Sequence, residues 1–134
     1  MTDMSDLFDA ARRAAKCSYS PYSHFRVGAA LLCKDGTVFT GTNVENRSYG
    51  LTNCAERSAI FTAISAGKKE FQAIAIFTPD SGQAVAPCGA CRQVLSEFAG
   101  KDFSVVFSGK KEKVETTLGE LYPFDSLQDL KDGT

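Results

Sequence analysis

The sequence predicts an α/β fold in which a mixed five-stranded sheet carries helices packed on its faces. Three observations support this prediction. The expected elements follow one another in the order α-β-β-α-β-α-β-β. Residues 72–78 form an almost wholly apolar strand, as expected of a central strand that is covered on both sides. Apolar residues at helical spacing follow Cys54 and Cys88, so two of the helices begin at cysteines.

The N-terminal elements are a helix and a hairpin. We expect Ser5 to cap the first helix, which ends near Lys16 and has an apolar face made of Leu7, Phe8, Ala11, Ala14 and Ala15. Residues 18–22 form a loop. Strands at 26–33 and 37–43 are joined by a tight turn at Asp35-Gly36, and small residues at 28–30 permit close packing.

The C-terminal part alternates helices with strands. A loop over 46–52 leads to the helix that begins at Cys54 and stops at Gly67. The strand at 72–78 and a further loop lead to the helix that begins at Cys88 and stops at Gly100. Strands at 103–107 and 113–117 follow, and a short turn of helix begins near Leu118.

Length and composition limit the possible functions. The 134 residues are enough for one domain, 1–134, with one core. The net charge is −1 and the only basic doublets are at 68–69 and 110–111, which argues against a nucleic-acid polymer as partner. No apolar run predicts a signal peptide or a membrane partner. Five cysteines, an odd number without an export signal, predict reduced thiols and a cytoplasmic protein.

The cysteines carry the strongest chemical signal. Cys54 begins one helix, and Cys88 and Cys91 lie at the start of another. Unpaired amide N–H groups and the helix dipole favour thiolates at these positions, and three thiolates together favour one Zn²⁺ per chain. No fourth ligand is evident, since Cys17, Cys33 and the single histidine, His24, lie in other contexts.

Glu56 stands two residues after the first thiol. Three protein ligands with an open fourth position are typical of catalytic zinc, which lowers the pKa of a bound water, and a neighbouring carboxylate can carry that proton. One alternative is a buried Cys54 unrelated to a thioredoxin-like CxxC at 88–91, but it explains neither Glu56 nor the loops described below. Glu56 alone would be interpreted as a first-turn acid favoured by the helix dipole.

These motifs resemble a known family. Cys54-Ala55-Glu56 with Pro87-Cys88-x-x-Cys91 resembles the zinc signature of nucleoside and nucleobase deaminases, with cysteine in the first-ligand place. Residues 18–30 (SYSPYSHFRVGAA) and 41–46 (GTNVEN) resemble those of the short, homotetrameric cytidine deaminases. The resemblance covers nearly the whole chain.

The resemblance implies a three-layer cytidine-deaminase-like fold and a zinc-dependent hydrolase of pyrimidine salvage. The implied reaction converts cytidine and 2′-deoxycytidine to uridine and 2′-deoxyuridine with release of ammonia. Glu56 would transfer protons to N3 and to the leaving amine. Arg57 would offset part of the charge of the thiolate ligands, with help from Gln93; otherwise Arg57 is a solvated helix charge.

The resemblance also implies the substrate contacts. Asn43 and Glu45 would bind the ribose 3′-hydroxyl, Phe25 would stack on the pyrimidine, and the Ala55 N–H would donate to O2, with Tyr49 nearby. Judged without the resemblance, Asn43 and Glu45 are turn residues and Phe25 is a core residue. We interpret His24 as structural, and Cys17 and Cys33 as small buried hydrophobes.

The C-terminal segment 121–124 contributes to the predicted assembly. The relatives are homotetramers whose neighbouring chains complete each pocket, and an aromatic residue near this terminus, here Phe124, covers the base. The alternative is a local cap of 121–124 over the chain's own sheet. Two other functions remain open at this point: deamination of another small aminopyrimidine, such as a nucleoside antibiotic, and a non-catalytic zinc or redox module, which would have no use for Glu56.

Overall fold

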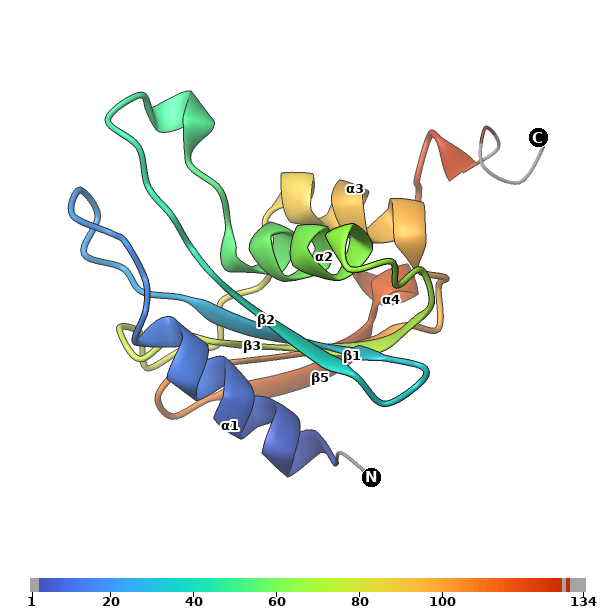
Figure 1. The fold of residues 1–134 in the computed structure, drawn as a ribbon, viewed down its shortest axis with the longest axis horizontal. Helices are drawn as coiled ribbons and strands as arrows, with labels where there is room; N and C mark the ends of the chain where they lie inside the picture. The colour runs from blue at the N-terminus through green and yellow to red at the C-terminus, as the bar shows by residue number, and fades with distance from the viewer. Residues whose placement is uncertain (1–2, 129, 131–134) are drawn as a thin grey trace.

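The computed structural model describes residues 3–128 and 130. Its centre is a five-stranded sheet in the order β2-β1-β3-β4-β5 (Figure 1). The strands are β1 (Gly28–Cys33), β2 (Val38–Thr42), β3 (Phe71–Phe77), β4 (Ser104–Ser108) and β5 (Lys113–Thr117). The helices are α1 (Met4–Ala15), the 3₁₀ helix η1 (Tyr49–Leu51), α2 (Ala55–Ser65), α3 (Gly89–Phe98) and α4 (Leu118–Leu121).

The sheet is mixed, as predicted. β3 and β4 run parallel, whereas the β1–β2, β1–β3 and β4–β5 pairs are antiparallel. The parallel pair needs a crossover, which α3 provides. β3 is the central strand, and its residues 73–76 are all buried, as its apolar sequence predicted.

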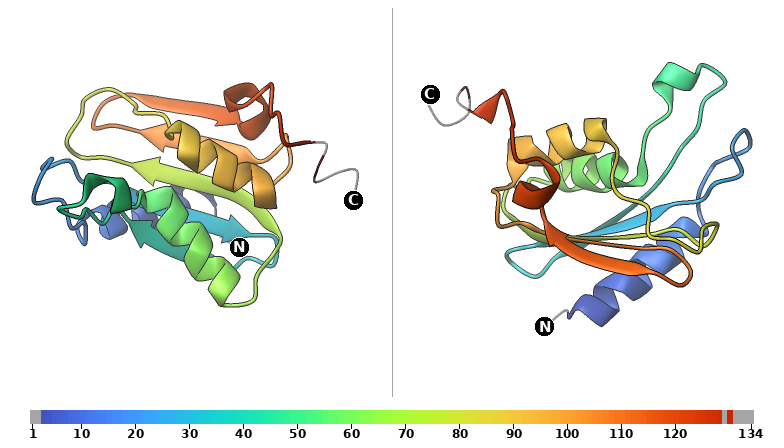
Figure 2. Two further views of the ribbon diagram at one scale, coloured as in Figure 1. Left: turned by 90° about the horizontal axis from the view of Figure 1, so that it is seen from above. Right: turned by 180° about the vertical axis from the view of Figure 1, so that it is seen from behind.

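Helices cover both faces of the sheet and make three layers. α1 lies on one face, and α2 and α3 lie side by side on the other (Figures 1 and 2). The prediction that Ser5 caps α1 was wrong. The cap is Asp3, whose carboxylate accepts a hydrogen bond from the Asp6 N–H at 2.9 Å, so Ser5 lies inside the first turn.

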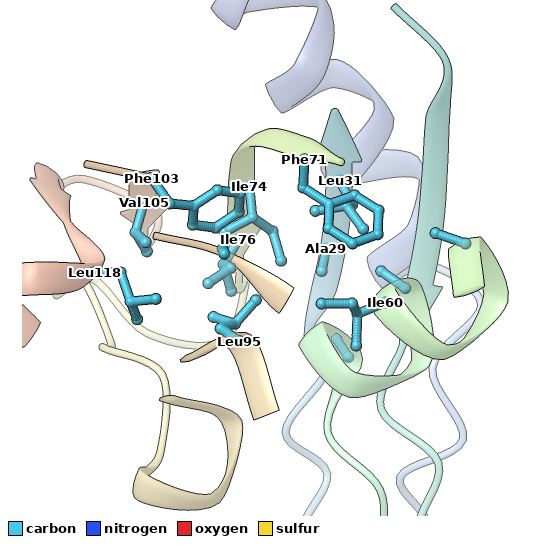
Figure 3. Packing of buried hydrophobic residues seen from close by; sticks show 14 of the residues in the cluster. Ala29, Leu31, Ile60, Phe71, Ile74, Ile76, Leu95, Phe103, Val105 and Leu118 are labelled. Atoms are coloured by element: carbon cyan, nitrogen blue, oxygen red, sulfur yellow. The ribbon is translucent and has the colours of Figure 1, made fainter. Parts of the chain in front are cut away.

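The larger core lies between the sheet and the α2–α3 layer. Leu31, Ile74 and Val105 from the sheet meet Ile60 of α2 and Leu95 of α3 (Figure 3). A second cluster packs α1 against the opposite face. Cys33 is buried in the larger core as predicted, whereas the prediction of a buried Cys17 was wrong, because Cys17 lies exposed just beyond the end of α1.

Two glycines let the helices approach the sheet closely. A Cβ atom at Gly28 would lie 2.0 Å from the Ala11 carbonyl oxygen of α1, and one at Gly41 would lie 2.3 Å from the Ala59 nitrogen of α2. Such contacts are far shorter than any carbon contact allows. Gly28 of β1 therefore serves the close packing predicted for residues 28–30, and Gly41 of β2 serves the same purpose on the opposite face of the sheet.

The first strand begins two residues later than predicted, for a reason that bears on the site. The N–H groups of Arg26 and Val27 donate to the side chains of Asp80 and Asn43 at 2.8 and 2.9 Å, so they are withdrawn from the strand ladder. η1 lies within the segment predicted as loop. Among the described residues, no helix is both long enough and apolar enough to span a membrane.

Candidate active site

The N-terminal ends of α2 and α3 bring the three predicted thiols together. Cys54 and Cys88 are the N-cap residues of α2 and α3, and Cys91 lies in the first turn of α3. The Cys54 and Cys88 Sγ atoms are 3.8 Å apart, and the Cys88 and Cys91 Sγ atoms are 3.4 Å apart. All three sulfurs lie within 4.8 Å of one another.

This donor set fits zinc. Tetrahedral zinc with Zn–S bonds of about 2.3 Å places its sulfur ligands about 3.8 Å apart, close to the separations of the three Sγ atoms. Among the described residues, the group contains only these three potential ligands. Three thiols without a fourth protein ligand match the open site expected of catalytic rather than structural zinc.

The surroundings of Cys54 favour its thiolate. A hydrogen bond from the Cys91 thiol, together with the Arg57 guanidinium, lowers the pKa of Cys54 to about 5. Arg57 donates from Nη2 to Cys54 Sγ at 3.3 Å, and its buried Nε has no hydrogen-bond partner within the described part of the chain. The bond to Cys54, with burial, raises the pKa of Cys91. A metal ion bound to both sulfurs would displace the proton that Cys91 donates to Cys54.

Glu56 is a buried carboxyl beside the thiols. Its side chain lies in the first turn of α2 and is only 5% exposed. Burial raises the pKa of Glu56 to about 7. A carboxyl group with such a pKa can both accept and return a proton near neutrality, which is what a general acid–base catalyst requires.

Glu56 and two of the thiols open into a cavity of about 420 Å³. This volume lies within the range usual for small-molecule sites. The cavity is lined mainly by residues of the segments 23–27, 43–56 and 76–88. Of the predicted substrate contacts, four line it, namely Phe25, Asn43, Glu45 and Ala55.

Asn43 and Glu45 have partners that the sequence did not predict. The buried Asn43 amide donates to the Phe25 carbonyl at 2.7 Å and accepts from the Val27 N–H and the Ser18 hydroxyl. The Glu45 carboxylate accepts from the Tyr22 and Ser23 N–H groups and from the Ser23 hydroxyl. Both side chains therefore shape the loop that presents Phe25. One Asn43 N–H and part of Glu45 Oε2 remain available to a ligand.

Tyr49 lies at the rim of the cavity rather than in its wall. Its ring is 75% exposed and meets Tyr22 edge to face, with centroids 6.0 Å apart. With Ser23, Glu45 and Thr52, these two tyrosines line a second hollow beside the cavity.

Phe124 and Gln93 do not line the cavity. The C-terminal segment runs past α4 on the side away from the loops 16–27 and 43–53 (Figures 1 and 2). There Tyr122 donates from its hydroxyl to Gln93 Oε1 at 2.6 Å. Phe124 is 92% exposed. Within one chain, Phe124 thus neither reaches its own cavity nor caps the sheet.

The structure adds lining residues that the sequence analysis missed. Thr78 follows β3, Asn53 precedes the first ligand, and Val85 and Ala86 precede the second motif. Asn53 also donates to the Ser58 hydroxyl at 3.1 Å. For Asn53, Val85 and Ala86, nearness to the cysteine motifs was the only available signal, and for Thr78 there was none, because nothing in their spacing distinguishes these residues from ordinary loop residues.

Comparisons with known proteins agree with this geometry. The family described as "Cytidine and deoxycytidylate deaminase zinc-binding region" matches residues 1–107. A cytidine deaminase of Halalkalibacterium halodurans is 48% identical over 122 residues, which are 90% of this chain and 92% of the relative. A cytidine deaminase of Sporosarcina psychrophila is 45% identical over 122 residues, 90% of this chain and 89% of the relative.

A solved structure shares the fold as well. The crystal structure of cytidine deaminase from Burkholderia pseudomallei superposes with a TM-score of 0.87 at 46% identity, covering 91% of this chain and 98% of that one. Sequence and fold agree over nearly the full length of both proteins, which confirms the predicted three-layer fold. On this evidence the chain belongs to the zinc-binding family of cytidine and deoxycytidylate deaminases.

Proposed function

We propose that this protein hydrolyses cytidine and 2′-deoxycytidine to uridine and 2′-deoxyuridine and releases ammonia. The observation that carries the proposal is the placement of a buried carboxyl, Glu56, beside three clustered thiols, two of which line the same cavity of about 420 Å³ as Glu56. A redox or structural zinc module would have no use for such a carboxyl. The identity to proteins named cytidine deaminase supports the choice of substrate.

Cys54, Cys88 and Cys91 would hold one zinc ion, which supplies a nucleophilic water at neutral pH by lowering its pKa. Arg57 reduces the excess negative charge of three thiolates by donating to Cys54 Sγ. Without this donor, the thiolate charge would oppose ionisation of the water.

Glu56 transfers the protons. It takes one proton from the attacking water and delivers it to N3 of the pyrimidine as the water oxygen bonds to C4. It then carries the second proton of the water, from the hydroxyl now on C4, to the C4 amine. The C4–N bond breaks and ammonia leaves. The sum is one water consumed and one ammonia released, with Glu56 returned to its starting state.

The cavity walls orient the nucleoside. Phe25 stacks on the base, the Ala55 N–H at the start of α2 donates to O2, and Asn43 and Glu45 bind the ribose 3′-hydroxyl. The Ser23 hydroxyl and the Tyr22 and Ser23 N–H groups lower the pKa of Glu45, so its carboxylate stays ionised. Its charge would repel a 3′-phosphate, which excludes polynucleotides.

The proposal includes a homotetramer in the cytoplasm, acting in pyrimidine salvage. Large apolar side chains lie exposed on the two loops that extend beyond the sheet (Figure 1): Tyr19, Tyr22, Val44, Tyr49 and Leu51. Exposed apolar patches of this kind mark interaction surfaces. In the tetramer, Phe124 of one chain would reach the cavity of another, with Tyr49 beside it.

The test is deamination by the purified, zinc-loaded protein, followed by the loss of cytidine's ultraviolet absorbance. Cytidine and 2′-deoxycytidine should be converted, whereas cytosines within a single-stranded DNA oligonucleotide should not. Comparable conversion of the oligonucleotide would contradict the assigned substrate class. Much faster conversion of an aminopyrimidine nucleoside antibiotic would favour the other deaminase function.

A further inference from the structure

An ion pair outside the cavity joins two of its walls. Arg26 and Asp80 are 54 residues apart in sequence. Arg26 Nε and Nη2 donate to the two carboxylate oxygens of Asp80 at 3.0 and 2.7 Å, and the Arg26 backbone N–H donates to Oδ2 at 2.8 Å. A bidentate guanidinium fork with an added backbone bond fixes orientation as well as distance.

Each partner belongs to a different wall. Arg26 stands between Phe25 and Val27, which both line the cavity, while neither Arg26 nor Asp80 lines it. Asp80 follows Thr78, a lining residue, and its N–H donates to the Thr78 hydroxyl at 3.3 Å. The same loop continues to Val85 and Ala86, which also line the cavity.

The Asp80 loop is itself anchored to the sheet. The Lys110 N–H donates to the Ser81 carbonyl at 2.6 Å, and the Lys111 and Glu112 N–H groups donate to the Gly82 carbonyl at 3.1 and 3.0 Å. These bonds attach the loop to the turn between β4 and β5. Asp80 is therefore a fixed point against which Arg26 can be held.

The Phe25 loop is held mainly by the side chains of Asn43 and Glu45 rather than by strand pairing. Between the end of α1 at Ala15 and the start of β1 at Gly28 it contains no helix or strand, apart from a single bridge between Tyr19 and Val44. On its β2 side, Asn43 holds the Phe25 carbonyl. On its other side, Asp80 receives the next N–H along the chain. The backbone around Phe25 is thus held from both sides.

We propose that Arg26 and Asp80 form a positioning pair that fixes Phe25 over the bound base. The proposal rests on the proposed function, since it assigns Phe25 to the base. A pair with side chains 48% and 22% exposed contributes little to global stability. Its loss should therefore weaken substrate binding more than it weakens the fold.

The experiment compares Asp80→Ala, which removes all three bonds, with Asp35→Ala as the matched control. Asp35 forms a similar ion pair with Lys68 at 2.8 Å, in a part of the molecule that contributes nothing to the cavity. In zinc-loaded protein, Asp80→Ala should raise KM for cytidine by about tenfold, the loss expected when one base–aromatic stack is weakened. kcat, zinc content and melting temperature should stay close to wild type, and Asp35→Ala should change none of them.

Two further readouts separate positioning from a merely structural role. Adding Asp80→Ala to Phe25→Ala should raise KM no further, because the aromatic ring that the pair positions is already gone. Amide hydrogen exchange in the peptide 18–27 should be faster in Asp80→Ala and unchanged in Asp35→Ala. Unchanged KM and exchange, or additive effects with Phe25→Ala, would overturn the proposal. Wild-type protein that failed to deaminate cytidine would refute the proposed function. The hydrogen-exchange comparison would still show whether the Arg26–Asp80 pair holds the Phe25 loop.

Discussion

Arg57 Nη2 donates a hydrogen bond to Cys54 Sγ over 3.3 Å, from the first turn of the helix that Cys54 caps. The bond follows from spacing, since residues three apart lie on one face of a helix. It places a permanent positive charge at the sulfur cluster. The Arg57 side chain therefore acts on the metal site through a ligand rather than through the substrate.

Replacing Arg57 by Gln should lower activity or zinc affinity by about 10- to 100-fold, as is usual when the partner of a metal ligand is lost. The reason is that Gln retains hydrogen bonding but removes the charge that offsets the thiolates. Steady-state kinetics and a competition assay with a zinc chelator measure the two effects. Arg57→Lys, which keeps the charge, should recover part of the loss; equal loss in both variants would contradict a charge effect.

Cys88→Ala and Cys91→Ala should each abolish zinc binding and activity, because two remaining thiols cannot hold the ion. Metal analysis of the wild type should give one zinc per chain. Cys17→Ala is the control, since Cys17 is exposed and belongs to no ligand group in the described residues. Full activity of metal-free protein would refute the mechanism.

Glu56→Gln should keep the fold and the zinc but lose at least about 10²–10⁴ in kcat, the usual contribution of one proton-transfer group. Glutamine has nearly the same shape, so the buried position stays filled while the group can no longer carry a proton. Turnover and zinc content should be measured on the same sample. A variant that kept a tenth of wild-type activity would show that Glu56 is only a helix-start acid.

Acid should weaken the contribution of Asp80 to stability. The Arg26 guanidinium lowers the pKa of Asp80 to about 2, whereas an unfolded chain has a value near 3.9. The folded-state pKa is the lower one, so the stabilisation is complete above about pH 4 and is lost as the pH falls towards 2. The free energy of unfolding in urea should be higher for wild type than for Asp80→Asn. The difference should be less than about 1 kcal/mol, because the pair is partly exposed. That difference should shrink below pH 4. A difference that stayed constant with pH would contradict a stabilising ion pair between Arg26 and Asp80.

The protein should run as a tetramer in light scattering, because the apolar side chains on its two extended loops are otherwise exposed. Phe124→Ala should then weaken cytidine binding while leaving zinc in place. Phe61→Ala, on the exposed side of α2, offers an aromatic substitution outside the cavity for comparison. A fully active monomer would refute the shared pocket, though not the deaminase.

The sequence by itself was enough to predict the sheet, the helices and the chemical centre. The spacing of apolar residues and the turn residues between them located the strands and helices to within a few residues. An element that buries one apolar face requires that spacing. The ligand set was predictable for a related reason. Two short motifs contain the residues concerned, namely Cys54, Glu56, Cys88 and Cys91. Each motif lies at the start of a helix, so the helix geometry alone positions its side chains relative to one another.

Only the tertiary structure decided how the walls of the cavity are held. Asn43, Glu45 and Asp80 contact the Phe25 loop across 16 to 54 residues of sequence. No periodicity encodes such contacts, since a loop side chain can reach many partners and packing selects one. Two local details were also missed: Asp3, two residues before Ser5, caps α1, and Cys17 lies exposed just beyond the end of that helix. Local patterns thus determined the elements and their chemistry, and long-range packing determined the shape of the site.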